Sequence, residues 1–492
     1  MLRLTSADLK KTKIETLTIP VCEDKDIHND PIIKAVIKKA LKLKEFNGKK
    51  DEVVTLYDLP EMNAQRVILS GLGKLEKIDQ EALRSMAGKT VKGCIKIGLT
   101  NLWFAVPDSV SVKIEISAVL EAMQEGAFLG NHLFQKFKVE KKRKALRQIH
   151  FLVTEKVAKK MRLLPSRITA VCEGTILARD WVNTPSNEKT PEKLTRSIVS
   201  QAKKQHLKVQ VLNEAQLKQK KLGALLAVAA GSQSKPSLVV LEHKVPGAKT
   251  TVALVGKGVT FDSGGLNIKT GNSMSNMKSD MSGAAAVAAA LITAAKLKTK
   301  TNIIGVIPIV ENMPSGKATR PGDIIRSYAG KTIEIGNTDA EGRLILIDAI
   351  SYVIKRYKPQ LLIDLATLTG ACVVALGDKI AGVFSNDDDL AAGIVASGDK
   401  THERCWRMPL PDDYKELLKS DFADMNNISS SRAGGAITAA LFLSEFAADT
   451  RWAHIDIAGP AYLKTESAYC GPGGTGFGVR LLSAMIGNYC DM

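Results

Sequence analysis

The stretch TVALVGKGVTFDSGG (residues 251–265) indicates the fold, because a short run of apolar and β-branched residues passes directly into a glycine-rich loop. An alanine-rich apolar run follows at residues 284–292, and another β-branched run follows at residues 302–309. A strand, a helix and a second strand in this order are typical of an α/β unit with parallel strands.

The same alternation continues on both sides of this unit. Further strands are expected at residues 208–212, 237–241, 332–335, 361–366 and 452–457, with helices between several of them. This pattern predicts an α/β fold, with a mostly parallel, doubly wound sheet that carries helices on both faces. The first third of the chain predicts a smaller α/β domain, with strands at residues 14–21, 53–57, 66–71 and 151–153 and helices at residues 79–95 and 110–129.

A chain of 492 residues is long enough for two domains, because single hydrophobic cores stop growing near roughly 250 to 300 residues. We expect a basic N-terminal domain over residues 1–160, a connecting helix over residues 161–187 and a catalytic domain over residues 188–492. The N-terminal segment lacks the apolar core of a secretory signal, and no apolar run reaches the roughly 18 residues of a membrane span. A cytoplasmic protein without a membrane anchor is therefore expected.

Cysteine and histidine give no local metal motif. The seven cysteines are scattered without a CxxC pair, and the seven histidines include no HExxH. Any bound metal must therefore rely on other ligands.

The chain is basic, with a formal net charge of +18. Residues 1–160 contain 30 Lys and Arg against 20 Asp and Glu, and they include the cluster at residues 141–144. Such a balance can attract nucleic acid, although a lysine-rich solvated surface gives the same composition and aromatic residues do not alternate with these charges.

Carboxylates are concentrated in three segments that follow or precede regular elements. Asp262 lies in the glycine-rich loop together with Lys257, and Asp280 precedes the alanine-rich helix. Asp339 and Glu341 lie two residues apart where the strand at 332–335 passes into a helix. Taken separately, Asp280 could be a helix cap, and the pair near Arg343 could form a salt bridge.

Together these segments would bring four acids to neighbouring strand ends, where they would repel one another unless cations neutralised them. Oxygen ligands alone suit Mg²⁺ or Mn²⁺, whereas a nitrogen ligand from Lys257 favours Zn²⁺, Co²⁺ or Mn²⁺. Lys257 would have to be neutral to bind a metal, which requires burial and a nearby dication. The sequence therefore predicts a metal site.

The motif NTDAEGR stands at residues 337–343, and through this intact motif the chain resembles the cytosolic leucine aminopeptidase family. Similar stretches are VGKGVTFDSGG at 255–265, MKSDMSGAAAV at 277–287, ENMPSGKATRPGDI at 311–324, ATLTGA at 366–371 and WAHIDIAG at 452–459. The resemblance covers residues 170–480, while the N-terminal third is only loosely similar to the family's variable domain.

The resemblance implies a leucyl aminopeptidase with two metal ions and assigns a ligand set to each. The tighter site would consist of Lys257, Asp262, Asp280 and Glu341, and the more exchangeable site would consist of Asp262, Asp339 and Glu341. Zn²⁺ or Mn²⁺ is expected, with Co²⁺ or Mg²⁺ as alternatives at the exchangeable site. The ions would hold a hydroxide nucleophile and bind the free α-amine of the substrate.

Further residues receive roles by the same resemblance. Lys269 would stabilise the oxyanion, Arg343 would hold a bicarbonate that moves the proton, and Met277, Thr367 and Gly370 would line the pocket for a leucine-like side chain. Without the resemblance, Lys269 could be a solvated loop cation. A homohexamer acting on peptides with a free N-terminus is also implied.

Two other functions are compatible with parts of the sequence. Converging carboxylates also serve two-metal phosphatases and nucleases, although a lysine ligand and the intact motif argue against that class. The basic N-terminal domain could in addition bind DNA in a regulatory role, as some bacterial relatives of the family are thought to do.

Overall fold

The computed structural model describes residues 2–489, which form two compact units. The first unit runs as far as Cys172 and also contains Thr465–Pro472, and the second unit contains Glu173–Lys464 and the chain from Gly473 onward. The division falls inside the long helix α6 (Leu164–Asn183). The domain bounds expected at residues 160 and 188 stay a prediction. Residues 465–472, which we expected in the catalytic domain, group with the first unit.

The first unit is built on a six-stranded sheet with the strand order β1-β6-β5-β2-β4-β3. All neighbouring strands are parallel except β3 and β4, which are antiparallel. Its strands are β1 (Leu2–Thr5), β2 (Ile14–Cys22), β3 (Val53–Tyr57), β4 (Ala64–Gly73), β5 (Asn101–Ala105) and β6 (Gln148–Leu152). Its helices are α1 (Pro31–Ala40), α2 (Gln80–Lys96), α3 (Ser109–Val112), α4 (Ile116–Gly130) and α5 (Glu155–Lys160). The predicted smaller α/β domain is confirmed.

The helix expected over residues 110–129 is interrupted in the structure. Lys113 adopts a left-handed backbone conformation with φ of 55°, which ends α3. α4 then starts at Ile116, after Glu115. Hydrophobic spacing alone did not indicate this break.

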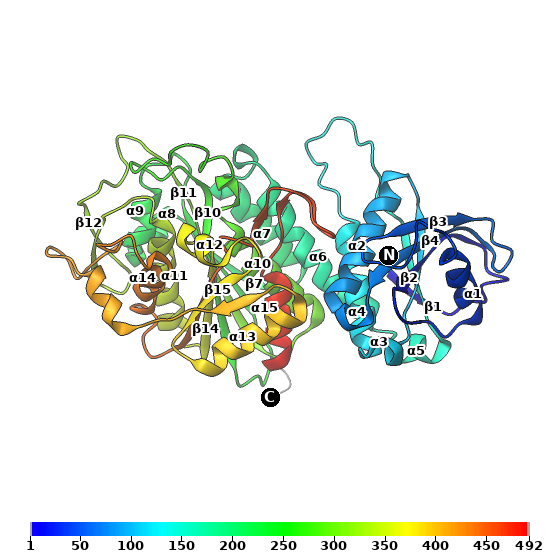
Figure 1. The fold of residues 1–492 in the computed structure, drawn as a ribbon. Coiled ribbons are helices and arrows are strands. Elements are labelled where there is room, and N and C mark those ends of the chain that lie inside the picture. Colours follow the sequence, from blue (N-terminus) through cyan, green and yellow to red (C-terminus); the bar gives the residue numbers. More distant parts are fainter. Residues whose placement is uncertain (1, 490–492) are drawn as a thin grey trace. The chain divides into compact units, whose positions relative to one another are not determined.

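The second unit contains a nine-stranded sheet with the order β16-β15-β18-β14-β9-β11-β8-β7, in which β10 also pairs with β11. Figure 1 labels β7, β10, β11, β14 and β15 of this sheet. The central strands β18, β14, β9 and β11 are parallel, and β8, β7 and β15 run antiparallel to their inner neighbours. The strands are β7 (Lys208–Leu212), β8 (Ser237–His243), β9 (Thr251–Gly256), β10 (Gly258–Asp262), β11 (Asn302–Asn312), β14 (Leu361–Ala366), β15 (Ala381–Ser385), β16 (Cys405–Arg407) and β18 (Arg451–Asp456).

Helices cover both faces of this sheet, as the sequence predicts. They are α7 (Pro191–Lys204), α8 (Glu214–Lys220), α9 (Gly223–Ala229), α10 (Ser282–Leu297), α11 (Glu341–Tyr357), α12 (Gly370–Leu376), α13 (Asp388–Thr401), α14 (Gly435–Ser444) and α15 (Val479–Tyr489). Successive residues of one strand enter different cores: Val252 and Leu254 of β9 pack with α10, whereas Ala253 and Val255 pack with α11. This alternation follows from the two-residue period of a strand that is buried on both sides.

Two expectations about strands need correction. The strand expected at residues 332–335 is outside the large sheet: β13 (Thr332–Glu334) pairs with β12 (Ile324–Arg326) and β17 (Met425–Asn426) in a separate three-stranded sheet. Residues 258–262, expected as loop, continue as β10. Two short strands, β19 (Tyr462–Leu463) and β20 (Gly473–Gly474), form a further pair.

Among the described residues, Met277–Leu297 is the one helical segment long and apolar enough to cross a membrane by length and composition. In its most apolar window, 83% of the residues are buried inside the protein. It contains α10, which is the buried helix expected from the alanine-rich run.

The side chain of Asp348 on α11 binds backbone N–H groups of α9 and of the turn after β12. Its carboxylate is fully buried and accepts the N–H of Leu225 at 3.0 Å and the N–H of Tyr328 at 2.7 Å. Burial raises the pKa of Asp348 to about 7, although the N–H groups act in the opposite direction.

We expect Asp348→Ala to lower the free energy of unfolding by about 3 kcal/mol, because it leaves two buried donors without partners. Asp387→Ala, which removes the N-cap of α13, should cost only about 1 kcal/mol.

Since the folded pKa of Asp348 is raised, its contribution to the free energy of unfolding is fully present below pH about 4 and is lost as the pH rises through about 7. The difference between wild type and Asp348→Ala in urea unfolding should therefore shrink from pH 5 to pH 8. A difference that grows with pH would mean that the two hydrogen bonds affect the pKa of Asp348 more strongly than burial does.

Candidate metal centre

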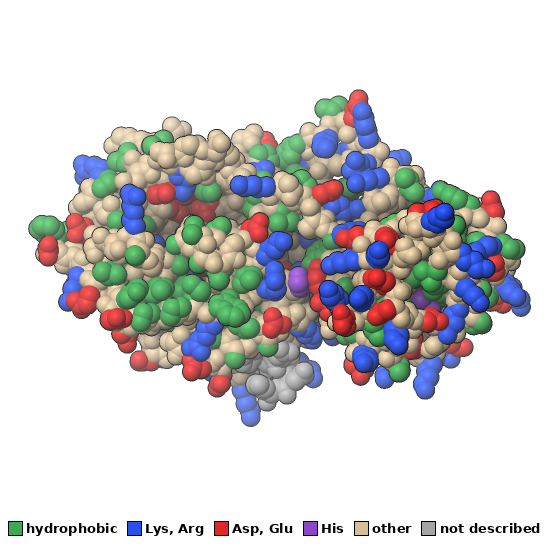
Figure 2. Space-filling model, viewed as in Figure 1, with side chains coloured by type: hydrophobic (Ala, Val, Ile, Leu, Met, Phe, Trp, Pro, Cys, Tyr) green, Lys and Arg blue, Asp and Glu red, His purple; other side chains and the backbone are tan. Residues whose placement is uncertain are grey.

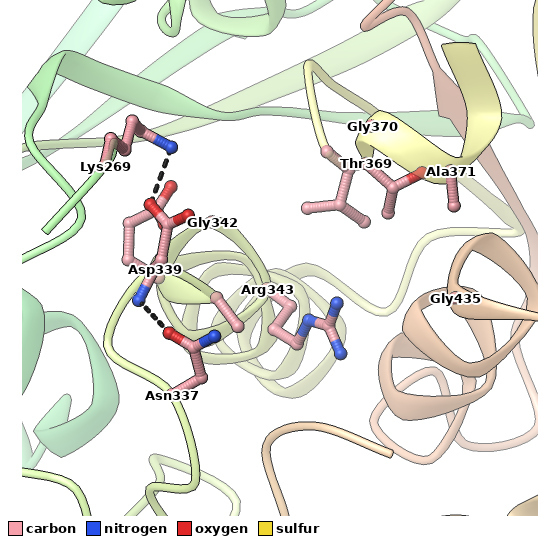
Figure 3. Close-up of a pocket in the computed structure, with 12 residues that line it drawn as sticks. Lys269, Asn337, Asp339, Gly342, Arg343, Thr369, Gly370, Ala371 and Gly435 are labelled. Atoms are coloured by element: carbon pink, nitrogen blue, oxygen red, sulfur yellow. Dashed lines mark hydrogen bonds and ion pairs between the residues drawn. The ribbon is translucent and has the colours of Figure 1, made fainter. Parts of the chain in front are cut away.

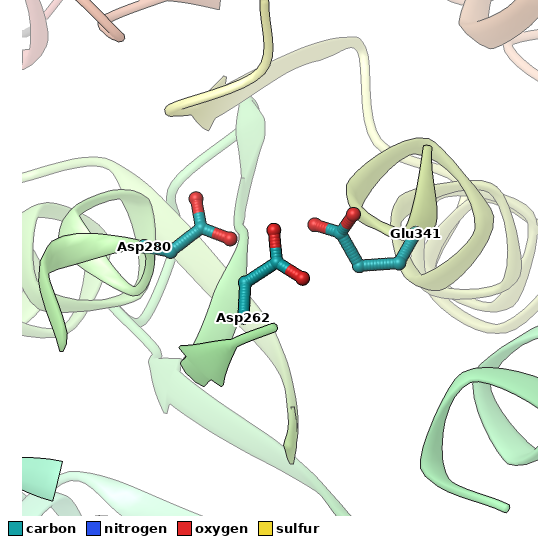
Figure 4. Close-up of side chains that lie close together, drawn as sticks. All are labelled: Asp262, Asp280 and Glu341. Atoms are coloured by element: carbon teal, nitrogen blue, oxygen red, sulfur yellow. The ribbon is translucent and has the colours of Figure 1, made fainter. Parts of the chain in front are cut away.

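Three buried carboxylates meet at one point of the second unit. Asp262 is the last residue of β10, Asp280 follows the short 3-10 turn η3 (Met277–Ser279), and Glu341 is the first residue of α11. Each offers a ligand oxygen within 4.8 Å of the others, and all three are at most 5% exposed. Figure 4 shows the three carboxylates pointing toward one another.

The residues converge in a different way from the one the sequence suggested. Only Asp262 stands at the end of a strand of the large sheet, and Glu341 reaches the site from the start of a helix that follows the small sheet. Asp280 does not cap α10, whose N-terminus has no side-chain cap. Its Oδ1 accepts instead from the hydroxyl of Thr367 at 2.7 Å.

Lys257 lies between β9 and β10 and joins the carboxylates. Its Nζ donates to the carbonyl oxygen of Thr367 at 2.8 Å and lies 2.8 Å from Asp280 Oδ1 and 2.9 Å from Glu341 Oε1. The distance to Glu341 is that of an ion pair, but the approach lacks hydrogen-bond geometry. Gly342 is required beside it, since a Cβ there would come within 2.7 Å of Nζ.

The electrostatics of the site reflect burial and mutual charge. Burial opposes the charge of Lys257, but Asp280, Glu341 and Asp262 outweigh it and raise its pKa above the ordinary value. Burial raises the pKa of Asp280 to about 6, and burial together with the charge of Asp262 raises the pKa of Glu341 to about 8. These shifts are typical of acids that lack sufficient positive charge.

Lys269 connects Asp262 with the fourth acid, Asp339. Its Nζ lies 2.8 Å from Asp262 Oδ2. It also lies 2.6 Å from Asp339 Oδ1, a contact that Figure 3 shows. Its side chain is only 14% exposed, so it is not a solvated loop cation. Burial would lower the pKa of Lys269, but these two carboxylates raise it. Burial also raises the pKa of Asp339.

The donor set fits divalent cations. Four carboxylates face two ammonium groups, and Oδ2 of Asp280 is buried with no hydrogen-bond partner among the described residues. An unsatisfied buried carboxylate oxygen is costly unless a cation binds it. Carboxylate oxygens with one amine nitrogen form a ligand set for a borderline dication.

A cavity of about 290 Å³ opens beside the carboxylates. Lys269, Asp339, Arg343 and Gly370 line it, and Figure 3 shows Arg343 reaching from α11 toward α14. Arg343 Nη1 donates to the carbonyl oxygen of Asn427 at 2.8 Å, whereas its buried Nε has no partner among the described residues. Burial lowers the pKa of Arg343 to about 10, so it remains a cation at neutral pH.

Two of the three residues expected to line the substrate pocket do not line this cavity. Met277 is half-buried at the first position of η3. The hydroxyl of Thr367 donates to Asp280, and its carbonyl oxygen accepts from Lys257. Gly370 lies on the cavity wall at the start of α12.

The structure adds two asparagines that sequence reasoning missed. Asn427, fully buried, donates from Nδ2 to the carbonyl oxygen of Asn337 at 2.8 Å and accepts the N–H groups of Gly336 and Asn337. Asn312, at the end of β11, donates to Asp262 Oδ1 at 2.9 Å. No spacing in the sequence connects Asn427 with the NTDAEGR turn. For Asn312, the available signals were its place at a strand end and its position in the family-like stretch at residues 311–324.

Comparison with known proteins identifies the family. Residues 176–483 match the catalytic domain of the cytosol aminopeptidase family, and residues 21–141 match its N-terminal domain. The chain is 41% identical to a "Probable cytosol aminopeptidase" of Geobacter sp. (strain M21), with 92% of each chain covered. It is 40% identical to a protein of the same name from Clostridium perfringens, with 98% of each covered.

A solved structure is similar over nearly the whole chain. The "Bottromycin maturation enzyme BotP in complex with Mn" superposes with a TM-score of 0.86 at 32% identity, covering 97% of this chain and 99% of that one. The buried carboxylates lie in the second unit, which also contains most of the match to the catalytic domain, whereas the match to the N-terminal domain lies in the first unit. The chain therefore belongs to the cytosol aminopeptidase family, and it is a metal-dependent aminopeptidase, a hydrolase that acts on peptides.

Proposed function

We propose that this aminopeptidase holds two divalent ions and removes leucine-like residues from the N-termini of peptides. The observation that carries the proposal is the convergence of Asp262, Asp280 and Glu341 with Lys257 and Lys269. That a relative with a similar structure is described in complex with Mn supports the presence of metal.

The ligands divide into two sets that share Asp262 and Glu341. Lys257 and Asp280 would complete the tighter site, and Asp339 would complete the exchangeable site. Zn²⁺ or Mn²⁺ is expected, with Co²⁺ or Mg²⁺ as alternatives at the exchangeable site. When bound, the ions supply a hydroxide nucleophile and hold the free amine of the substrate.

Lys257 has to change its protonation state to act as a ligand. Its ammonium now contacts Asp280 and Glu341, in the position of a cation. A dication bound to the same oxygens repels this charge and favours the neutral amine. Thr367 then still accepts from the remaining N–H groups of Lys257.

Lys269 and Arg343 are the candidate catalytic residues on the cavity wall. The ammonium of Lys269 would donate to the oxygen of the scissile carbonyl as negative charge develops there. The buried Nε of Arg343 has no hydrogen-bond partner in the part of the chain that the structure describes. Arg343 would hold bicarbonate through charge-assisted hydrogen bonds, so that this anion accepts the proton from water. Met277, Thr367 and Gly370 remain the proposed determinants of leucine preference.

Paired assays on free and blocked peptides test this function. A leucine-initiated peptide with a free amine should be cleaved, whereas its N-acetylated form should be cleaved at least roughly 10²-fold more slowly, because the blocked nitrogen cannot bind a metal. A strong chelator should reduce cleavage of the free peptide to background, and Zn²⁺, Mn²⁺ or Co²⁺ should restore it. Equal cleavage of the two peptides would contradict coordination of the amine.

Assembly, location and nucleic-acid binding stay predictions. The relatives carry the name cytosol aminopeptidase, which supports a cytoplasmic location. A homohexamer is expected from the family. The DNA-binding alternative rests on exposed residues 141–144, and binding of duplex DNA that weakens steeply with salt would be needed to support it.

A further inference from the structure

Asn312 is buried between the two segments that carry the proposed exchangeable metal site. It ends β11, and its Cα is in register with that of Asp262 on the parallel strand β10. Its side chain is 5% exposed, and it lies in the family-like stretch at residues 311–324, to which the sequence assigned no role at the metal site.

The amide of Asn312 has a defined orientation. Its Nδ2 donates to Asp262 Oδ1 at 2.9 Å and to the carbonyl oxygen of Thr338 at 3.1 Å. Since both neighbours are acceptors, the nitrogen must face them. Its Oδ1 faces Gly265, where a Cβ would come within 2.9 Å, so a glycine at φ of 64° leaves room for the amide.

This amide determines which oxygen of Asp262 remains for a cation. Oδ1 of Asp262 accepts two N–H groups, one from Gly264 and one from Asn312, each at 2.9 Å. Oδ2 is left facing the ammonium of Lys269 at 2.8 Å. Two donors on one oxygen prevent the carboxylate from rotating.

The same nitrogen connects the loop of Asp262 with the turn of Asp339. Thr338 directly precedes Asp339, and its carbonyl is held by Asn312. On the other side, the backbone carbonyl of Asn312 accepts from the N–H of Ser263 at 3.0 Å and from its hydroxyl at 2.7 Å. One residue thus fixes the chain beside both Asp262 and Asp339.

We propose that Asn312 is a positioning residue that orients Asp262 and Asp339 for the exchangeable ion, an inference that rests on the proposed two-metal function. Loss of its N–H groups should weaken binding of that ion roughly 10- to 100-fold, as is typical when a partner of a ligand is removed. The tighter ion should be affected less, because Lys257 and Asp280 have no contact with this amide.

A matched control is available on the same strand. Asn302 begins β11 and also joins its strand to a loop, accepting the N–H of Val245 at 2.8 Å and donating to the carbonyl oxygen of Ala248 at 3.3 Å. Asn302→Ala therefore removes similar hydrogen bonds far from the carboxylates along β11. Asn312→Leu keeps the volume of the side chain and separates loss of the donor from creation of a cavity.

The experiment measures Mn²⁺ bound to the complete, metal-stripped chain by equilibrium dialysis and elemental analysis, together with the Tm of the metal-free protein. Asn312→Ala and Asn312→Leu should both raise the half-saturating Mn²⁺ concentration of the weaker site by roughly 10-fold or more. Asn302→Ala should lower the Tm without changing Mn²⁺ binding. Binding by both Asn312 variants within about 2-fold of wild type would overturn the inference. Absence of Mn²⁺ binding by wild type would overturn the proposed function and this inference with it.

Discussion

Glu341→Ala is expected to reduce kcat/KM by at least roughly 10³-fold, which corresponds to a loss of about 4 kcal/mol of transition-state stabilisation. Glu341 is 2% exposed, and its carboxylate points toward Asp262 (Figure 4). It belongs to both proposed ligand sets. Without its carboxylate, neither ion keeps a full set of ligands. The variant should also bind less than the two equivalents of metal expected for wild type, as measured by elemental analysis.

The fold should survive this substitution. Lys257 keeps Asp280 at 2.8 Å and the carbonyl of Thr367 at 2.8 Å, so its ammonium is not left without a partner. Burial raises the pKa of Glu341, which means that its charge is held at a cost. Far-UV circular dichroism and the Tm of the metal-free protein should therefore be close to those of wild type.

Glu445→Ala is the control, because it removes another lysine-paired glutamate: Glu445 is partly buried and pairs with Lys331 and Lys415. It should keep wild-type activity and metal content. Full activity of Glu341→Ala would sink the assignment of the metal ligands.

The sequence predicted the local elements of the second unit well, because they depend on short-range patterns. The strand expected at residues 208–212 is β7, and the alanine-rich run is the core of α10. Alternation of apolar residues reports burial on two faces of a strand, and that information is contained within five or six residues.

What could not be predicted depends on contacts between distant segments. β13 has the composition of a strand in the large sheet, yet it pairs with β12 and β17, and only the fold determines that partner. Asn427 reaches Asn337 across 90 residues, and no motif links the two. Residues 465–472 likewise group with the first unit through contacts with residues distant in the sequence.

The candidate site was accessible to sequence reasoning because its acids are unusual even without a structure. Asp262, Asp280 and Glu341 do come together, although their approach differs from the predicted strand ends. The pairing of Lys269 with Asp339 was not predicted, because the family resemblance assigned Lys269 to the oxyanion and Asp339 to a metal ion. Identity of the metals, in contrast, depends on ligand geometry that forms only when ions bind.

Lys269→Met is the second substitution with a large expected effect, and it should act mainly on kcat. Removal of one donor to a developing oxyanion typically costs roughly 10²- to 10³-fold in kcat. KM should change little, because this interaction strengthens only in the transition state. Steady-state kinetics on a free leucine-initiated peptide measures both parameters.

Metal binding separates this role from that of a ligand. In the metal-free protein the ammonium of Lys269 contacts Asp262 Oδ2 and Asp339 Oδ1, so it competes with a cation for both oxygens. Lys269→Met should therefore bind Mn²⁺ at least as tightly as wild type, while Glu341→Ala binds it more weakly. Lys317→Met, which changes an exposed loop lysine, should alter neither kcat nor the affinity for Mn²⁺. If Lys269→Met instead lost metal together with activity, the lysine would be a structural partner of the carboxylates, because an oxyanion donor is not needed to retain the ions.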